Sequence, residues 1–197
     1  MPHFYNNKEK YFVSVNFKVM YSSMREQTHL KKVKSFRLYF SKKPKYVIGR
    51  KPYTRLESFY RDKLNKDLDK TSYWLRSQKI FFKPLGIKKS DSIEKKYTSL
   101  KKITFPEFIR FLPEVHMNNR HLHPQYIIFK KLKVEKKFKM ESKENRDFIE
   151  TELKLDLSQK VNTTEKAKFD LQWTDEMYKI VNEVYKEDFD YFNYSKK

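Results

Sequence analysis

Two short segments of the chain bring cations and hydroxyl groups close together. In NFKVMYSSMREQ, Lys18 is followed by Ser22 and Ser23. In YVIGRKPYTRLESFYRDKL, Arg50 is followed eight residues later by Ser58. An ammonium or guanidinium group, hydroxyl groups and the N–H groups of a helix start can together bind a phosphate or a sulfate. Taken singly, the Lys18 segment is more typical of a solvated lysine beside an ordinary serine cap, and the Arg50 segment is at least as typical of a solvated helix face.

Each segment requires a strand before it and a helix after it. β-Branched and aromatic residues predict a strand over Tyr11–Phe17 and a short buried strand over Tyr46–Ile48. The serine pair is expected to open one helix, and Pro52 to begin another that runs to near Leu68. Strands that alternate with helices predict an α/β fold with a parallel sheet. Ligands of such sheets bind beyond the carboxyl ends of the strands.

Two further helices are expected later in the chain. Thr104 can cap a short helix around Phe105–Phe111, with Pro106 in its first turn. Thr174 can cap a last helix, whose apolar residues recur at helical spacing. We interpret that apolar stripe as core packing.

The charge of the chain is strongly positive. Its 197 residues include 45 Lys and Arg against 25 Asp and Glu, a net charge of +20. Residues 1–140 hold 35 of these cations and 11 of these acids, and therefore a net charge of +24. Such a field attracts nucleic acids, nucleotide phosphates, sulfated sugars and acidic membrane surfaces alike. A codon usage rich in A and T explains an excess of lysine equally well.

Composition also excludes some chemistry. The absence of cysteine excludes disulfides, thiol nucleophiles and zinc sites built on thiolates. The longest run without charge, His121–Phe129, is half of what a transmembrane helix needs. We expect one domain over residues 1–197 and, without a signal-like start, a cytoplasmic location; a Golgi location would require an anchor that this sequence lacks.

The two cationic segments, in this order, resemble the sulfotransferase superfamily. The resemblance is to its carbohydrate sulfotransferase branch, the Golgi-type family with its bacterial and viral relatives. That family has a Lys–x–small–x–Ser/Thr–Ser/Thr loop and an Arg–acidic–Pro–aromatic–x–Arg–Leu–x–Ser–x–Tyr segment. The residues that match these two patterns are Lys18, Ser22 and Ser23, and then Arg50, Pro52, Tyr53, Arg55, Leu56, Ser58 and Tyr60.

Three later segments extend the resemblance to about Phe12–Tyr194. TFPEFIRFL resembles the family's Phe-x-x-Phe helix, NRHLHPQY its Asn-x-His-x-x-Pro-Gln turn, and VNEVYKEDFDYFNY its closing segment. The chain departs from the family pattern at Met20, where a small residue is usual, at Phe17 in place of proline, and at Lys51 in place of an acid. Only about 26 residues separate Ser23 from Arg50, where the family usually has a further strand and helix.

The resemblance implies a compact, trimmed, P-loop-like sulfotransferase domain. Such a protein moves a sulfuryl group from 3′-phosphoadenosine-5′-phosphosulfate to a hydroxyl of a carbohydrate or related acceptor. It implies that Lys18 neutralises the leaving oxygen, that the serine pair holds the 5′-phosphate, and that Arg50 and Ser58 hold the 3′-phosphate. Arg55 belongs to the same expected nucleotide-binding set. No metal is required.

A histidine is the expected general base, because its ordinary pKa of about 6.5 lies near the working pH. Among five histidines, His121 and His123 are the candidates, although a structural role in a turn suits them as well. The His-x-His pair is not expected to bind a metal ion, because no carboxylate lies nearby at ligand spacing. The lysine excess favours an acidic glycan as acceptor.

Two other functions remain open at this point. The basic region and its scattered aromatic residues also suit a nucleic-acid-binding or ribosome-associated protein, although no recognised nucleic-acid motif occurs. A degenerate sulfotransferase fold that only binds a ligand is the third possibility, favoured by Met20 and the short interval before Arg50.

Overall fold

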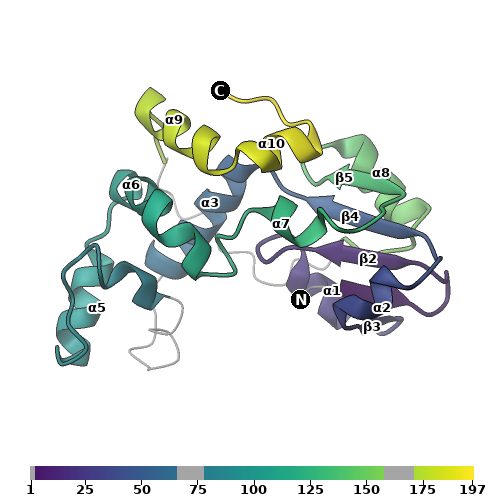
Figure 1. Cartoon of the computed structure of the whole chain (residues 1–197), viewed down its shortest axis with the longest axis horizontal. Helices are drawn as coiled ribbons and strands as arrows, with labels where there is room; N and C mark the ends of the chain where they lie inside the picture. The colour runs from purple at the N-terminus through teal and green to yellow at the C-terminus, as the bar shows by residue number, and fades with distance from the viewer. Residues whose placement is uncertain (1–2, 66–77, 158–170) are drawn as a thin grey trace. The chain divides into compact units, whose positions relative to one another are not determined.

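The computed structural model describes residues 3–65, 78–157 and 171–197 (Figure 1). It is an α/β fold in which helices flank a five-stranded mixed sheet. The chain forms two compact units, and the prediction of a single domain stays a prediction. The first unit comprises Met1–Arg55, Gln125–Thr163 and Glu187–Ser195, and the second comprises Leu56–Pro124, Thr164–Lys186 and Lys196–Lys197.

The sheet belongs to the first unit and has the strand order β3-β1-β2-β4-β5. β2 pairs in parallel with β4, and β4 with β5, whereas β1 is antiparallel to both β2 and β3. The five strands are β1 (His3–Asn6), β2 (Phe12–Val15), β3 (Leu30–Lys32), β4 (Lys45–Gly49) and β5 (Lys136–Lys139).

The prediction of an α/β fold with parallel strands flanked by helices is confirmed, but the sheet is mixed, because β1 pairs antiparallel with both of its neighbours. The cause is a tight turn between β1 and β2. The Asn6 side-chain oxygen accepts hydrogen bonds from the N–H groups of Lys8 and Glu9, and Lys10 has a left-handed φ of 61°. This turn reverses the chain within a few residues, so that the two strands must pair antiparallel.

Helices cover both faces of the sheet. The side chains of successive strand residues alternate between two apolar clusters, as a pleated strand requires. Val13 and Ile48 pack in one cluster with Met24 and Ile149, and Phe12 and Val47 pack in the other with Leu38, Phe129 and Phe192. The helices that supply these residues are α1 (Tyr21–Glu26) and α8 (Lys143–Thr151) on one face, and α2 (Ser35–Tyr39), α7 (Gln125–Phe129) and α10 (Lys186–Phe192) on the other.

The interval between Ser23 and Arg50 holds a strand and a helix after all, β3 and α2. The interval is therefore shortened rather than empty of secondary structure. β3 has three residues and α2 has five. β3 is an edge strand of the sheet, and α2 lies near that edge (Figure 1).

The turn after β4 is closed by the last helix of the first unit. The Phe192 ring lies against Gly49, so closely that a Cβ atom on Gly49 would stand 2.5 Å from ring carbons. The Tyr53 ring packs on Phe189, with their centroids 5.2 Å apart. The residue before the Arg50 segment must therefore be glycine for packing reasons, since its side-chain space is filled.

The second unit is helical. It begins within α3 (Pro52–Tyr60), at Leu56, and α3 continues into a π-helical turn (Arg61–Asn65). The predicted end of this helix near Leu68 lies outside the described residues. Its other main helices are α5 (Ile93–Lys101), α6 (Phe105–Val115) and α9 (Asp175–Val184), with the 3-10 turns η2 (Lys79–Phe81) and η3 (His116–Asn118). The caps Thr104 and Thr174 are confirmed, the former in a reciprocal capping box with Glu107.

Within the described ranges, no helix combines the length and the apolar character needed to cross a membrane.

Candidate functional site

A cavity of about 310 Å³ lies in the first unit at the carboxyl ends of the three parallel strands. Each strand contributes residues from the segment that follows it. Lys18, Val19 and Met20 follow β2, Arg50 and Thr54 follow β4, and Met140 and Glu141 follow β5. Sequence reasoning placed Lys18 and Arg50 at such an edge, and the structure brings both to one cavity.

The loop that carries Lys18 is wound tightly between β2 and α1. The Asn16 side-chain oxygen accepts from the N–H of Phe17 at 2.7 Å, and its carbonyl accepts from the N–H of Val19 at 3.1 Å. Lys18 and Met20 adopt left-handed φ values of 67° and 54°. This conformation costs an L-residue roughly 1–2 kcal/mol and favours glycine. Met20 therefore occupies a position at which this backbone favours glycine.

Arg50 joins this loop to the start of α3. Its Nη1 atom donates to the Lys18 carbonyl at 3.2 Å, and its Nε atom lies 3.3 Å from Thr54 Oγ1. The Gln125 side chain holds its backbone from the other side. Gln125 Oε1 accepts from the N–H of Arg50 at 3.0 Å, and Gln125 Nε2 donates to its carbonyl at 2.8 Å. These bonds fix the Arg50 backbone beside the Lys18 loop.

A buried ion pair lies beneath this turn. Arg55 Nη2 lies 3.6 Å from Asp188 Oδ2, and the two side chains are 1% and 0% exposed. Asp188 also accepts hydrogen bonds from the Tyr126 N–H at 2.8 Å and from Gln125 Nε2 at 3.2 Å. Burial raises the pKa of Asp188, and the Arg55 guanidinium and these donors oppose that shift.

This network connects segments that the resemblance singled out separately. Arg50 and Arg55 come from the second cationic segment, Gln125 from the NRHLHPQY segment and Asp188 from the closing segment. Their contacts are long-range in sequence, and sequence reasoning did not foresee them. Arg55, which the resemblance assigned to nucleotide binding, does not line the cavity and forms this buried pair.

Four residues of the cavity were not singled out from the sequence, and Glu141 is the charged one among them; the other three are Val19, Thr54 and Met140. The Glu141 carboxylate accepts from the Lys51 N–H at 2.8 Å, from Thr54 Oγ1 at 3.0 Å and from the Tyr194 hydroxyl at 3.0 Å. Burial raises the pKa of Tyr194, and the adjacent Glu141 charge raises it further. A carboxylate at the start of α3 occupies donors that an incoming anion could use and opposes its charge. The signal in the sequence was an acid two residues after the end of β5, a strand that was itself not predicted.

Not every predicted site residue lines this cavity. Ser22 and Ser23 are the second and third residues of α1, as expected for a helix opening, but neither is among the lining residues. Ser58 lies later on α3, in the part of that helix that belongs to the second unit. Its assignment to the 3′-phosphate stays a prediction.

Both candidate bases belong to the second unit. His123 Nε2 donates to the Met117 carbonyl at 2.8 Å, and the His121 ring lies 6.3 Å from the Phe59 ring. These contacts match the alternative of a structural turn, and the assignment of either residue as base stays a prediction. Across residues 3–65, 78–157 and 171–197, no three His, Asp or Glu side chains are grouped as a metal site requires.

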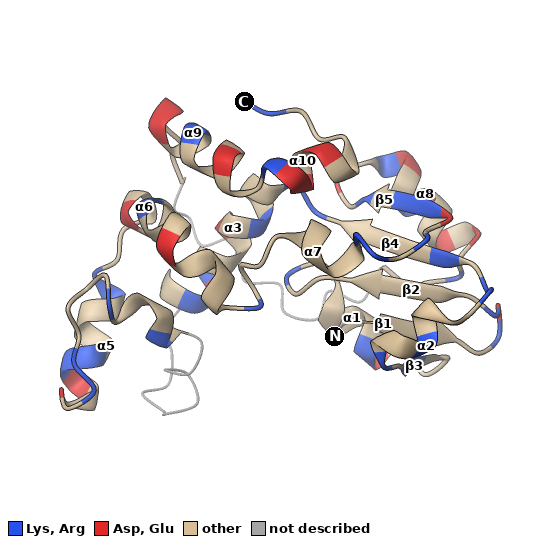
Figure 2. Ribbon diagram, viewed as in Figure 1, with Lys and Arg blue, Asp and Glu red and all other residues tan. Residues whose placement is uncertain are grey.

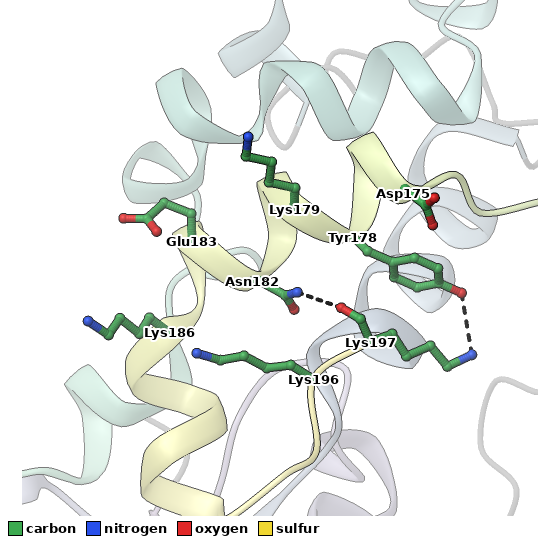
Figure 3. Close-up of a pocket in the computed structure, with 8 residues that line it drawn as sticks. All are labelled: Asp175, Tyr178, Lys179, Asn182, Glu183, Lys186, Lys196 and Lys197. Carbon is green, nitrogen blue, oxygen red and sulfur yellow. Dashed lines mark hydrogen bonds between the residues drawn. The ribbon is translucent and has the colours of Figure 1, made fainter.

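A larger cavity, of about 770 Å³, lies in the second unit between α9 and the residues at 196–197 (Figure 3). Asn182 Nδ2 donates to the Lys197 carbonyl at 2.7 Å, and Lys197 Nζ donates to the Tyr178 hydroxyl at 3.3 Å. The other lining residues are Asp175, Lys179, Glu183, Lys186 and Lys196. None of these side chains comes from the cationic segments, so the smaller cavity is the candidate site.

Comparisons with models of protein families, with curated proteins and with solved structures give no match for this chain.

Proposed function

We propose that this protein is a sulfotransferase that uses 3′-phosphoadenosine-5′-phosphosulfate and transfers the sulfuryl group to a hydroxyl of a carbohydrate or related acceptor. The observation that carries the proposal is the convergence of Lys18 and Arg50 on one cavity, joined by the bond from Arg50 Nη1 to the Lys18 carbonyl. These cations were singled out from two separate sequence segments, and the donor of this reaction is a nucleotide with several negative charges.

The position and size of the cavity also support the proposal. Its edge of the sheet is the usual ligand edge of α/β proteins, and its volume lies at the lower end of the range for small-molecule sites. Gln125 and the Arg55–Asp188 pair fix the Arg50 turn before any ligand arrives. Preorganised cations of this kind stabilise charge that develops in a transition state without a cost of reorganisation.

In the proposed reaction, the acceptor hydroxyl oxygen forms a bond to the donor sulfur, and the bond from sulfur to the bridging oxygen breaks. The electron pair of that bond leaves with adenosine 3′,5′-bisphosphate, and Lys18 neutralises the charge on the departing oxygen. The hydroxyl proton passes to a general base, for which His121 and His123 remain the predicted residues. The protein chiefly supplies position and countercharge.

Thermal denaturation with adenosine 3′,5′-bisphosphate tests the donor site directly. A ligand that binds only the folded state raises the melting temperature. We expect such a rise for the wild-type chain and its loss in Arg50→Ala. The matched control is Arg37→Ala, which removes an exposed arginine outside the cavity and should leave the rise unchanged. No rise at millimolar nucleotide, or an equal rise in both variants, contradicts the proposal.

A ligand-binding module without catalysis is the second candidate, and two observations favour it. Met20 and Met140 place thioethers on the cavity, and Glu141 places a negative charge there. Transfer of labelled sulfate from the donor to a panel of glycans and small alcohols separates the two candidates. Nucleotide binding without transfer to any acceptor would support the binding module. RNA binding that survives physiological salt, without nucleotide binding, would favour the nucleic-acid reading instead.

A further inference from the structure

The segment between α1 and β4 presents an exposed aromatic and cationic surface. Phe36, Tyr39 and Phe40, at the helix α2 and its carboxyl end, are 62%, 44% and 87% exposed. The exposed cations around them are Lys31, Lys32, Lys34, Arg37, Lys42 and Lys43. We call these nine residues the α2 surface; blue ribbon marks its cations on β3 and α2 in Figure 2.

Contacts on the opposite side of α2 fix the orientation of this surface toward solvent. Leu38, on the opposite side of α2, is fully buried in the apolar cluster with Phe12 and Val47. Buried Lys45 donates from its Nζ atom to the carbonyls of Ser41 and Lys43, which fixes the chain after the helix. Since Phe36 and Phe40 are four residues apart, they lie on the same side of α2, one turn from each other.

The charge of the segment is of one sign. From Gln27 to Lys45 the sequence has seven Lys or Arg residues and no Asp or Glu. Two of the cations contact the buried Tyr5 side chain. The Arg37 Cζ atom lies 5.1 Å from the centroid of the Tyr5 ring, and Lys43 Nζ donates to the Tyr5 hydroxyl at 2.6 Å. Exposed rings therefore stand among cations that have no acidic neighbour in sequence to neutralise them.

We propose that the α2 surface binds the surface of an anionic lipid bilayer. Phenylalanine side chains enter the boundary between headgroups and acyl chains, and flanking Lys and Arg are attracted to the negative headgroups. A bilayer therefore matches both the aromatic and the cationic side chains of the α2 surface. A sulfated sugar would match the cations, but it has no apolar interior into which the phenylalanine rings could insert. Base stacking on RNA requires rings set along a groove that follows the phosphates. The α2 surface contributes to neither of the two cavities described above.

Cosedimentation of the full chain with lipid vesicles tests this proposal. At about 0.15 M salt, we expect binding to vesicles with roughly 30% phosphatidylserine and little binding to pure phosphatidylcholine. Phe36→Ser with Phe40→Ser should weaken binding at least tenfold, because apolar insertion is lost. The matched control is Met117→Ser with Ile127→Ser, which removes two other exposed apolar side chains and should change nothing. Melting curves of both variants establish that they fold.

A fluorescent variant gives an independent readout. In Phe40→Trp, the tryptophan emission should shift to shorter wavelength when phosphatidylserine vesicles are added, relative to the wild-type chain. Absence of binding at this salt overturns the proposal, as does binding that the Phe36→Ser and Phe40→Ser changes leave intact, because charge alone then explains it. Binding of single-stranded RNA, but not of vesicles, that depends on the same two rings would also overturn it in favour of a nucleic-acid surface.

Discussion

The Arg50 turn and the Lys18 loop line the same cavity, but different parts of the chain hold them in place. Arg50 is held by residues distant in sequence: Gln125 binds its backbone, and Asp188 pairs with Arg55 below it. The Lys18 loop is held locally by Asn16 and by the bond from Arg50 to the Lys18 carbonyl, and it contains two left-handed residues that are not glycine. One side of the site is thus braced by tertiary contacts, and the other carries local backbone strain.

This difference separates two ways in which a binding site can fail. A braced turn loses its geometry when a distant buried partner is removed, and the whole unit loses stability with it. A strained loop can change locally, and relief of its strain need not harm the fold. Substitutions in the two regions should therefore act mainly on stability in the first case and mainly on ligand affinity in the second.

The largest effect is expected at the brace. Asp188→Ala leaves the buried Arg55 guanidinium without its carboxylate, which should lower the free energy of unfolding by about 3–5 kcal/mol. Urea denaturation measures this loss. In the double variant Arg55→Met with Asp188→Ala, no buried charge remains unpaired, and much of the loss should be recovered. Equal losses in the single and double variants would show that the pair does not brace the turn.

Acid should act on the strand that leads to the Lys18 loop. Burial lowers the pKa of His3 to about 4, and its Nδ1 atom lies 2.7 Å from Ser14 Oγ on β2. Because the unfolded chain binds this proton near pH 6.5 and the folded chain does not, stability falls between pH 6.5 and pH 4. Through His3 alone, the free energy of unfolding should be roughly 3 kcal/mol lower at pH 4 than at neutral pH.

Denaturation of the wild-type chain and of His3→Asn, measured over the same pH range, isolates the contribution of His3 to the loss of stability in acid. The variant should lose less stability between neutral pH and pH 4, since it no longer has the histidine that takes up the proton. Parallel curves for the two proteins would mean that other groups account for the acid sensitivity.

An intermediate effect is expected from the acid inside the cavity. If the cavity binds adenosine 3′,5′-bisphosphate, Glu141→Gln removes a repulsion worth about 1 kcal/mol in a watery site, a gain of roughly fivefold in affinity. Glutamine can still accept hydrogen bonds from Lys51 and Thr54. Isothermal titration calorimetry measures the gain, and Glu144→Gln, which removes an acid on α8, provides the control. Unchanged affinity in Glu141→Gln would place the nucleotide away from this carboxylate.

The smallest effect is expected at the strained loop. Met20→Gly suits the left-handed backbone and removes a thioether from the cavity, at the cost of some packing against the first apolar cluster. We expect stability within about 1 kcal/mol of wild type and a two- to threefold gain in nucleotide affinity. Met20→Leu, which keeps the bulk, should show neither change in affinity nor relief of strain. A marked loss of affinity in Met20→Gly would mean that the methionine itself contacts the ligand.

The elements that sequence predicted well carry strong local signals. β2 (FVSV) and β4 (KYVIG) are rich in β-branched and aromatic residues, and α3, α6 and α9 begin with a proline or a capping threonine. Three strands were not predicted, β1, β3 and β5, and two of them carry weak signals: β3 and β5 read LKK and KKFK, in which exposed lysines hide the alternation of a buried strand. Without β5 beside β4, nothing in the sequence could bring Glu141 to the cavity.

The candidate site was predicted in part for the same reason. Lys18 and Arg50 could be placed because each follows a recognisable strand. The contacts of Gln125 and Asp188 with the Arg50 turn span 75 and more than 130 residues, and no local pattern encodes pairing at such separation.

The packing of Phe192 on Gly49 has a consequence for how the protein is made. During synthesis, the Arg50 turn leaves the ribosome long before residues 188–192. Until then, Arg55 lacks the carboxylate of Asp188, and Gly49 lacks the ring of Phe192 that packs against it. Folding of the sheet unit must therefore finish after translation of its last segment, and a stalled ribosome short of Asp188 would hold an incompletely packed intermediate.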